Sequence, residues 1–174
     1  MFAEESEGDV TWNKVTTLAG ITEGQYVIIN GGFYLPSPTT TTSPKAVEAP
    51  TITEKTIADE NVTSAMKWSF TSTGTGIANQ FYVKNSNGDY LYATDNNAGV
   101  RVSNTEDKWT FENGTTDCFA MKESTKSRYC AEAPDYNDWR SYTSKTATNY
   151  KGNGEKIELY KKTQEITYTY YTNI

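Results

Sequence analysis

The sequence predicts an all-β fold, and within that class a β-trefoil made of three pseudo-repeats of four short strands. Two observations support this prediction. Tyrosine and threonine are abundant while leucine is scarce, a composition that suits pleated, half-buried surfaces. In addition, one hairpin pattern recurs three times along the 174 residues. A β-sandwich or another small β-barrel is the alternative fold.

Each repeat begins with a β-hairpin pattern, in which apolar residues alternate on both sides of a polar turn. The three hairpins are QYVIINGGFYL (25–35), FYVKNSNGDYLY (81–92) and CFAMKESTKSRYCA (118–131). Tyr34, Tyr90 and Tyr129 fall at equivalent places after the turns, so we expect all three to pack inside. The orientation of Tyr92 is left open by the pattern.

An apolar doublet closes each repeat, and a further strand lies between the hairpin and the doublet. The doublets are Trp68 and Phe70, Trp109 and Phe111, and Ile157 and Leu159, which we expect to form core layers. The intervening strands are APTITEKTI (49–57), GVRVS (99–103) and DWRSYT (138–143). Repeat length is uneven because the first repeat holds the insertion PSPTTTTSPKAVEAP (36–50), which a surface loop can absorb. Helix is limited to one short turn within 56–66.

Composition excludes several classes of function. The chain has no histidine, so Ser-His-Asp triads, Cys-His pairs and His-ligated metal sites are all ruled out. A net charge of −6 argues against a nucleic-acid partner, because phosphates require a basic face. No apolar run reaches the length of a membrane span. Carboxylates are scattered, and none pair as an evident acid and base. We therefore expect no enzyme, cofactor or metal.

The stretch DYNDWRSY (135–142) is the candidate ligand site. It aligns with DNNAGVRV (95–102), since Arg140 follows Tyr129 by eleven positions and Arg101 follows Tyr90 by eleven. The simpler interpretation is a polar turn entering a scaffold strand. The alternative is a sugar-binding loop, because aromatic rings beside carboxylate and amide groups suit a sugar ring. Its candidate residues are Asp135, Tyr136, Asn137, Asp138, Trp139, Arg140 and Tyr142. A calcium site is disfavoured, because their spacing matches no established calcium loop.

Cys118 and Cys130 flank the third hairpin symmetrically. If Phe119 lies opposite Tyr129, the two cysteines face each other at a separation that suits a disulfide. The sequence therefore predicts a disulfide and an oxidising compartment, with two buried free thiols as the alternative.

Residues 22–162 are expected to form the trefoil domain. Residues 1–21 form an acidic N-terminal extension with a possible first strand, and no signal peptide is recognisable in them. Residues 163–174 are interpreted as a linker, or as a strand leading toward a following domain. We expect the domain to be monomeric.

The order GQYVI, FYL, KWSF, FYVKNSNGDYLY, GVRVS, KWTF, RYC, DWRSY and IELYKK resembles a recurrent module of secreted and surface-anchored proteins from gut anaerobic bacteria. More distantly, the sequence is similar to ricin-type and fascin-like trefoils. It lacks the repeated Gln-x-Trp of the ricin-type lectins, having KWSF, KWTF and KIELY instead, so no sugar-binding residues are carried over. The resemblance implies an accessory domain, extracellular or at the cell surface.

The sequence therefore favours a non-catalytic extracellular binding module, with carbohydrate as the first ligand to test and a surface protein as the other partner. One alternative is a structural spacer within a larger surface protein. Another is a hydrolase inhibitor that uses the insertion 36–50; a lectin, by contrast, is expected to tolerate removal of that loop.

Overall fold

The structure is a computed structural model that describes residues 1–96 and 99–173. Asn97 and Ala98, part of the stretch aligned above with 135–142, lie outside the described residues. Strands dominate, with five single turns of 3-10 helix between them. The strands are β1 (Phe2–Val15), β2 (Gly24–Asn30), β3 (Phe33–Tyr34), β4 (Val47–Glu48), β5 (Thr56–Ala58), β6 (Trp68–Ser72), β7 (Gln80–Lys84), β8 (Tyr90–Ala93), β9 (Val100–Ser103), β10 (Trp109–Asn113), β11 (Phe119–Glu123), β12 (Arg128–Ala133), β13 (Asp138–Tyr142) and β14 (Glu158–Tyr171).

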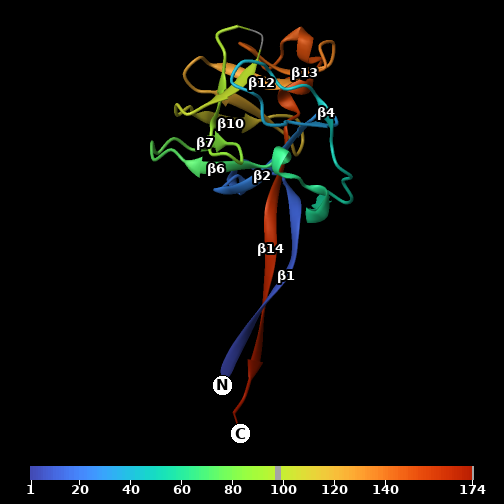
Figure 1. The fold of residues 1–174 in the computed structure, drawn as a ribbon, viewed down its shortest axis with the longest axis vertical. Coiled ribbons are helices and arrows are strands. Elements are labelled where there is room, and N and C mark those ends of the chain that lie inside the picture. The colour runs from blue at the N-terminus through green and yellow to red at the C-terminus, as the bar shows by residue number, and fades with distance from the viewer. Residues whose placement is uncertain (97–98, 174) are drawn as a thin grey trace.

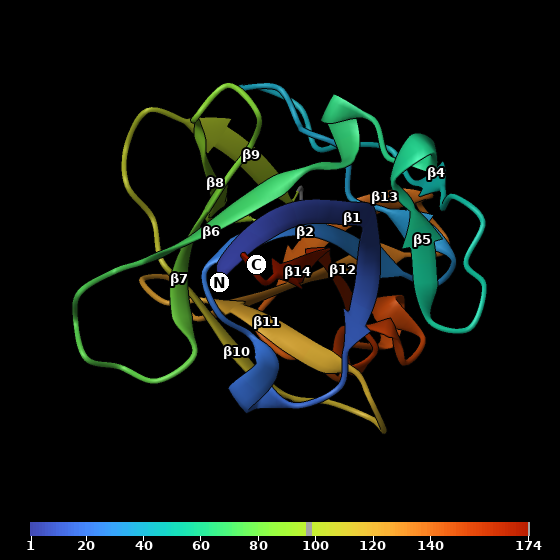
Figure 2. The same ribbon diagram turned by 90° about the horizontal axis from the view of Figure 1, so that it is seen from below.

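Strand register repeats three times, as a β-trefoil requires. Three pairings join each closing doublet to the next hairpin, namely Phe70 with Val83, Phe111 with Met121, and Leu159 with Ile28. Three more close the hairpins, namely Ile29 with Tyr34, Lys84 with Tyr90, and Lys122 with Tyr129. The predicted trefoil is confirmed, and Figure 2 shows the strands arranged around the barrel axis.

The core is aromatic, and Trp68 and Trp109 lie in it as the sequence predicted. Trp68 and Trp109 are 1% and 0% exposed, and each donates its indole N–H to a backbone carbonyl, that of Leu35 or Leu91. Tyr34 is buried, but Tyr90 and Tyr129 are only half-buried. The expectation of full packing is therefore correct for the first of the three hairpin tyrosines and wrong for the other two, whose rings are covered by lysine ammonium groups instead.

The third strand of the first repeat, which lies between the hairpin and the closing doublet, differs from the prediction. β4 pairs with β3 as β9 pairs with β8 and β13 with β12, so Val47–Glu48 is the equivalent strand. The stretch 49–57 does contribute strand β5, but this pairs with β1 over Thr11–Asn13. The predicted helical stretch holds two 3-10 turns, Asp59–Asn61 and Ser64–Met66.

Both ends of the chain form one two-stranded ribbon that extends away from the barrel (Figure 1). β1 and β14 pair continuously in antiparallel register from Phe2 opposite Tyr171 to Val15 opposite Leu159, apart from a bulge between Glu7 and Val10. The upper part of β14 completes the barrel by pairing with β2 over Glu158–Lys161. Within the described residues, no helix is long and apolar enough to cross a membrane.

Candidate functional site

The stretch 135–142 is a tight turn that enters β13. The backbone N–H groups of Tyr136 and Asn137 both donate to the carbonyl of Ala133 at 3.0 Å, and Asn137 has a φ of 52°. Asparagine tolerates this left-handed conformation better than most residues. Because Tyr90 pairs with Ser103 and Tyr129 with Tyr142, Arg101 and Arg140 occupy equivalent places, as the sequence predicted.

Two of the candidate ligand residues are inside the protein. Trp139 is 0% exposed and belongs to the main core cluster, where it takes the place that Val100 has in the second repeat. Tyr142 is 8% exposed, and its ring packs edge-on against that of Tyr150 at 4.9 Å. Neither ring is available to stack on a sugar, so their assignment as ligand residues is corrected to core residues.

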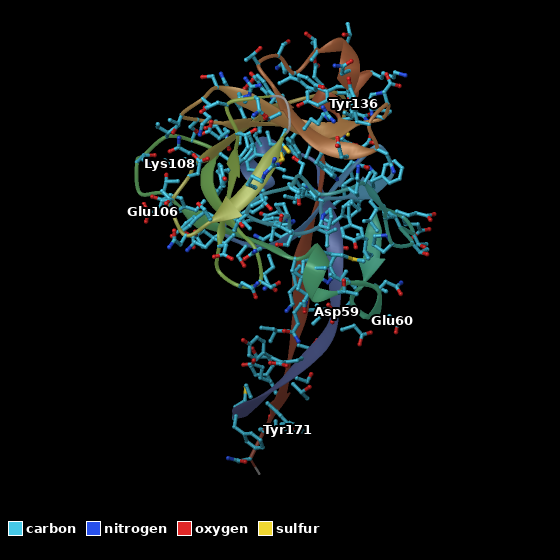
Figure 3. The ribbon with its side chains drawn as sticks, turned by 45° about the horizontal axis from the view of Figure 1, so that its top comes forward. Asp59, Glu60, Glu106, Lys108, Tyr136 and Tyr171 are labelled. Atoms are coloured by element: carbon cyan, nitrogen blue, oxygen red, sulfur yellow. The ribbon has the colours of Figure 1, made fainter. Side chains whose placement is uncertain are left out.

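In the exposed part of the loop, each charged side chain already contacts an oppositely charged or aromatic partner. Tyr136 is 44% exposed, and the Arg140 guanidinium lies 3.6 Å from its ring centroid (Figure 3 labels Tyr136). Asp138 holds that guanidinium through contacts of 2.8 and 3.3 Å. Asp135 accepts from the Lys151 ammonium at 2.6 Å. Because these carboxylates already have cationic partners, the loop is a poor calcium site, and the described residues hold no cluster of metal-ligating side chains.

The insertion 36–50 is packed onto this loop. The backbone N–H of Trp139 donates to the carbonyl of Pro44 at 3.0 Å, and the backbone N–H of Ala46 donates to the carbonyl of Asn137 at 2.9 Å. Removing the insertion would therefore leave the backbone N–H of the buried Trp139 without this acceptor and destabilise the scaffold. Removal of the insertion was expected above to distinguish a lectin from a hydrolase inhibitor. It cannot do so, because the scaffold itself depends on the insertion.

A cleft that the sequence did not reveal lies between β8, β9 and the turn that joins β11 to β12. We call it the Tyr92 cleft. Its volume is about 360 Å³, and it is lined by Tyr92, Ser103, Thr105, Glu106, Asp107, Thr125 and Lys126. Tyr92 is half-buried, and the Lys126 ammonium lies 5.8 Å from its ring centroid. Glu106, labelled in Figure 3, lies exposed in the loop that follows β9. The cleft thus combines a tyrosine ring, three serine and threonine hydroxyl groups and both signs of charge.

A buried carboxyl pair forms one wall of the Tyr92 cleft. Glu123 is 0% exposed and accepts the backbone N–H groups of Thr125 and Lys126 at 2.7 and 2.6 Å. Asp107 is 9% exposed, and its Oδ2 atom has no hydrogen-bond donor among the described residues. Burial, then the neighbouring Glu123 carboxyl, raises the pKa of Asp107 to about 8. The raised pKa favours the protonated form of Asp107 beside the Glu123 carboxyl.

Comparison of the three repeats indicates that the pair of Asp107 and Glu123 has a structural role in the hairpin. Glu123 follows Lys122 as Asn30 follows Ile29 and Asn85 follows Lys84, and all three polar residues are buried. Asn85 closes its hairpin by accepting the N–H groups of Asn87 and Asp89. Its amide then donates outward to Ser37. Glu123 accepts the N–H groups of Thr125 and Lys126 in the same way but has no amide to donate, and the neighbouring carboxyl of Asp107 has a raised pKa that favours its protonated form.

A larger cleft, of about 530 Å³, lies at the root of the ribbon. It is lined by Gly8, Asp9, Val10, Thr11, Ala58, Asp59 and Glu60. Asp59, labelled with Glu60 in Figure 3, accepts the indole N–H of the buried Trp12 at 2.8 Å. No aromatic side chain lines this cleft, so it offers no platform for stacking a ring.

The disulfide prediction is wrong, because both cysteines are free. Met121 pairs with Cys130, which places Cys118 three residues away along the strand, roughly 10 Å. Cys130 occupies the core position that Leu35 and Leu91 have in the other repeats. Its burial raises the pKa of the thiol far above the usual value.

We expect a thiol reagent to react with Cys118, which is half-exposed, and to leave Cys130 unmodified until the protein unfolds. Intact mass after labelling in native buffer and in denaturant measures this. A Cys118→Ser variant serves as the control and should take up no label in native buffer. Equal labelling of both thiols in the native protein would contradict the burial of Cys130.

No protein family and no curated protein matches this sequence. Its fold is similar to that in the crystal structure of the Rhizoctonia solani agglutinin. The match has a TM-score of 0.58 and 17% sequence identity, and it covers 81% of this chain and 96% of the agglutinin. At this identity the similarity supports the fold alone, an all-β trefoil.

Proposed function

We propose that this trefoil is a non-catalytic module that binds carbohydrate in the Tyr92 cleft. The observation that carries the proposal is the half-buried Tyr92 ring at the wall of a cleft that also holds the hydroxyl groups of Ser103, Thr105 and Thr125. A sugar presents an apolar ring face and a rim of hydroxyl groups, so it needs an aromatic surface and several hydrogen-bonding groups together.

The polar groups of the cleft fit that requirement. Ser103, Thr105 and Thr125 can each donate and accept, the Glu106 carboxylate accepts, and the Lys126 ammonium donates. The fold neighbour is itself an agglutinin, which supports a binding role over a catalytic one. An extracellular setting is part of the same proposal. It rests on the sequence resemblance, since the free cysteines remove the support expected from a disulfide.

We expect Tyr92→Ala to weaken binding of the glycan by about tenfold or more, because it removes the stacking surface; a factor of ten is about 1.4 kcal/mol. A glycan microarray identifies the ligand, and calorimetric titration of that glycan measures the affinity. Circular dichroism checks that the variant is folded.

Tyr136→Ala is the matched control, because it removes the exposed ring of the other candidate loop. Unchanged affinity in this variant supports the Tyr92 cleft. Loss in Tyr136→Ala with full binding in Tyr92→Ala would move the site to residues 135–140. No binding by the unmodified protein to mucin, plant or microbial glycans would overturn the function itself.

A further inference from the structure

The ribbon of β1 and β14 has two open edges. β5 covers the outer edge of β1 only at Thr11–Asn13, and β2 covers that of β14 only at Glu158–Lys161. Beyond these contacts, the described residues provide no third strand, and the side chains on both faces are exposed. A two-stranded ribbon in water is only marginally stable, and an open edge is a template for another strand.

The two edges differ in how well they are protected. Between Phe2 and Val10, β1 carries Glu4, Glu5, Glu7 and Asp9 together with the bulge. Charges and bulges are the usual means of blocking edge-to-edge pairing. From Ile166 to Tyr171, β14 has no charged residue and consists of β-branched and aromatic side chains. The edge of β14 is therefore the one open to a partner.

One face of this edge is apolar. The register places Ile166, Tyr168 and Tyr170 on the same side of the ribbon, where they are 49%, 52% and 65% exposed. Thr167 and Thr169 lie on the opposite side. A row of large exposed side chains along an unpaired strand indicates an interaction surface.

We propose that β14 pairs with β14 of a second copy of this chain, antiparallel about a twofold axis at Tyr168. A twofold interface must be complementary to itself, and the stretch ITYTY (166–170) meets this condition. Tyr168 then lies opposite its own copy, Ile166 opposite Tyr170, and Thr167 opposite Thr169. Aromatic, aromatic–aliphatic and Thr–Thr pairs across strands are each favourable. This interface revises the expectation of a monomer.

Sterically, the arrangement is feasible. In this register Tyr171 of one copy lies opposite Glu165 of the other. Glu165 follows Lys161, the last residue of β14 that β2 covers, by four residues. The two trefoil heads therefore sit at opposite ends of a four-stranded sheet. Figure 1 shows the ribbon extending well clear of the head, which leaves room for the second copy.

The net negative charge does not oppose this pairing. The two β1 strands form the outer edges of the four-stranded sheet, three strand spacings apart, or roughly 14 Å. This exceeds the Debye length of about 8 Å at physiological ionic strength. A single strand pair buries less than the roughly 1,600 Å² of a standard interface, so we expect a dissociation constant in the micromolar range.

Sedimentation velocity over a concentration series tests the dimer. We expect the unmodified chain to associate reversibly, and Tyr168→Lys to raise the dissociation constant at least about tenfold, because two lysines would face each other at the axis. The matched control is Ser6→Lys, which adds the same charge to the exposed β1 strand and should leave association unchanged. A chain that stays monomeric throughout, or equal weakening by both variants, would overturn the proposal.

Cysteine trapping tests the register independently, in a Cys118→Ser background. Facing Cα atoms in antiparallel strands lie about 4.5 to 5.5 Å apart, within the range of a disulfide. Tyr168→Cys should therefore cross-link to itself under mild oxidation. Ile166→Cys alone should not, because its copy lies roughly 14 Å away, but it should cross-link when mixed with Tyr170→Cys. Self-linking of Ile166→Cys as fast as Tyr168→Cys would overturn the proposed axis.

Discussion

Replacing Trp139 by alanine is expected to lower the free energy of unfolding by about 3 to 5 kcal/mol, the range for deletion of a buried tryptophan. The side chain is 0% exposed and packs in the main core cluster, so its removal leaves a large cavity. Because a domain of this size is stabilised by roughly 5 to 15 kcal/mol, the variant should be close to unfolding at physiological temperature. Urea denaturation followed by circular dichroism measures the change.

Phenylalanine substitutions give the matched comparison. The indole N–H of Trp139 has no acceptor among the described residues, whereas that of Trp109 donates to the Leu91 carbonyl at 2.8 Å. Trp139→Phe removes an unsatisfied donor, which offsets part of the lost packing, while Trp109→Phe leaves a buried carbonyl unpaired. We therefore expect Trp109→Phe to be more destabilising than Trp139→Phe by about 1 kcal/mol.

A Trp139→Ala variant that stays stable but loses glycan binding would contradict the core assignment and show that this ring is a ligand residue.

The repeat made the equivalence of positions in the second and third repeats predictable from sequence. The equivalence of Arg101 with Arg140, and of Val100 with Trp139, follows from counting residues after Tyr90 and Tyr129, and the strand pairing confirms it. Equivalent positions in the three repeats have equivalent surroundings. Trp68 and Trp109 recur at the same place in two closing doublets, and this recurrence identifies them as core residues. Trp139 was ambiguous because it has no aromatic equivalent in the second repeat.

The positions of the strands were easier to predict from sequence than the strands with which they pair. Residues 56–58 form a strand that overlaps the predicted strand 49–57, but it pairs with β1 and not with β3. β4 is only two residues long and lies inside the stretch 36–50, interpreted above as an insertion, so it carries no alternating pattern. The disulfide prediction failed for a related reason. It assumed that Phe119 faces Tyr129, whereas Lys122 does, and a shift in register separates the two cysteines.

The Tyr92 cleft and the ribbon depend on contacts between distant segments. The cleft is assembled from β8, the end of β9 with the loop that follows it, and a hairpin turn of the next repeat, none of which carries a motif by itself. In the ribbon, Phe2 pairs with Tyr171 from the opposite end of the chain. Sequence alternation in 163–171 indicates a strand, but only the folded barrel brings the acidic N-terminal segment beside it.

Replacing Asp107 by asparagine is expected to stabilise the protein at pH 8 and to remove a pH dependence of its stability. The pKa of Asp107 is about 8 in the folded protein, against an ordinary value of 3.8. Folding therefore favours the protonated carboxyl. Below about pH 4 both states are protonated and the stabilisation is complete; it declines as the pH rises from about 4 to about 8 and is constant above that. Asparagine keeps a donor toward Glu123 at every pH, so it avoids this loss.

The expected gain at pH 8 is on the order of 3 kcal/mol. Each unit between the folded and unfolded pKa corresponds to about 1.4 kcal/mol, and the Lys126 ammonium together with access of water to the cleft offsets part of the total. Urea denaturation at a series of pH values measures the difference between variant and unmodified protein, which should vanish near pH 4. Glu106→Gln is the control, because this exposed carboxylate lines the same cleft and should leave the pH profile unchanged. Parallel profiles for Asp107→Asn and the unmodified protein would show that Asp107 does not hold the proton shared with Glu123.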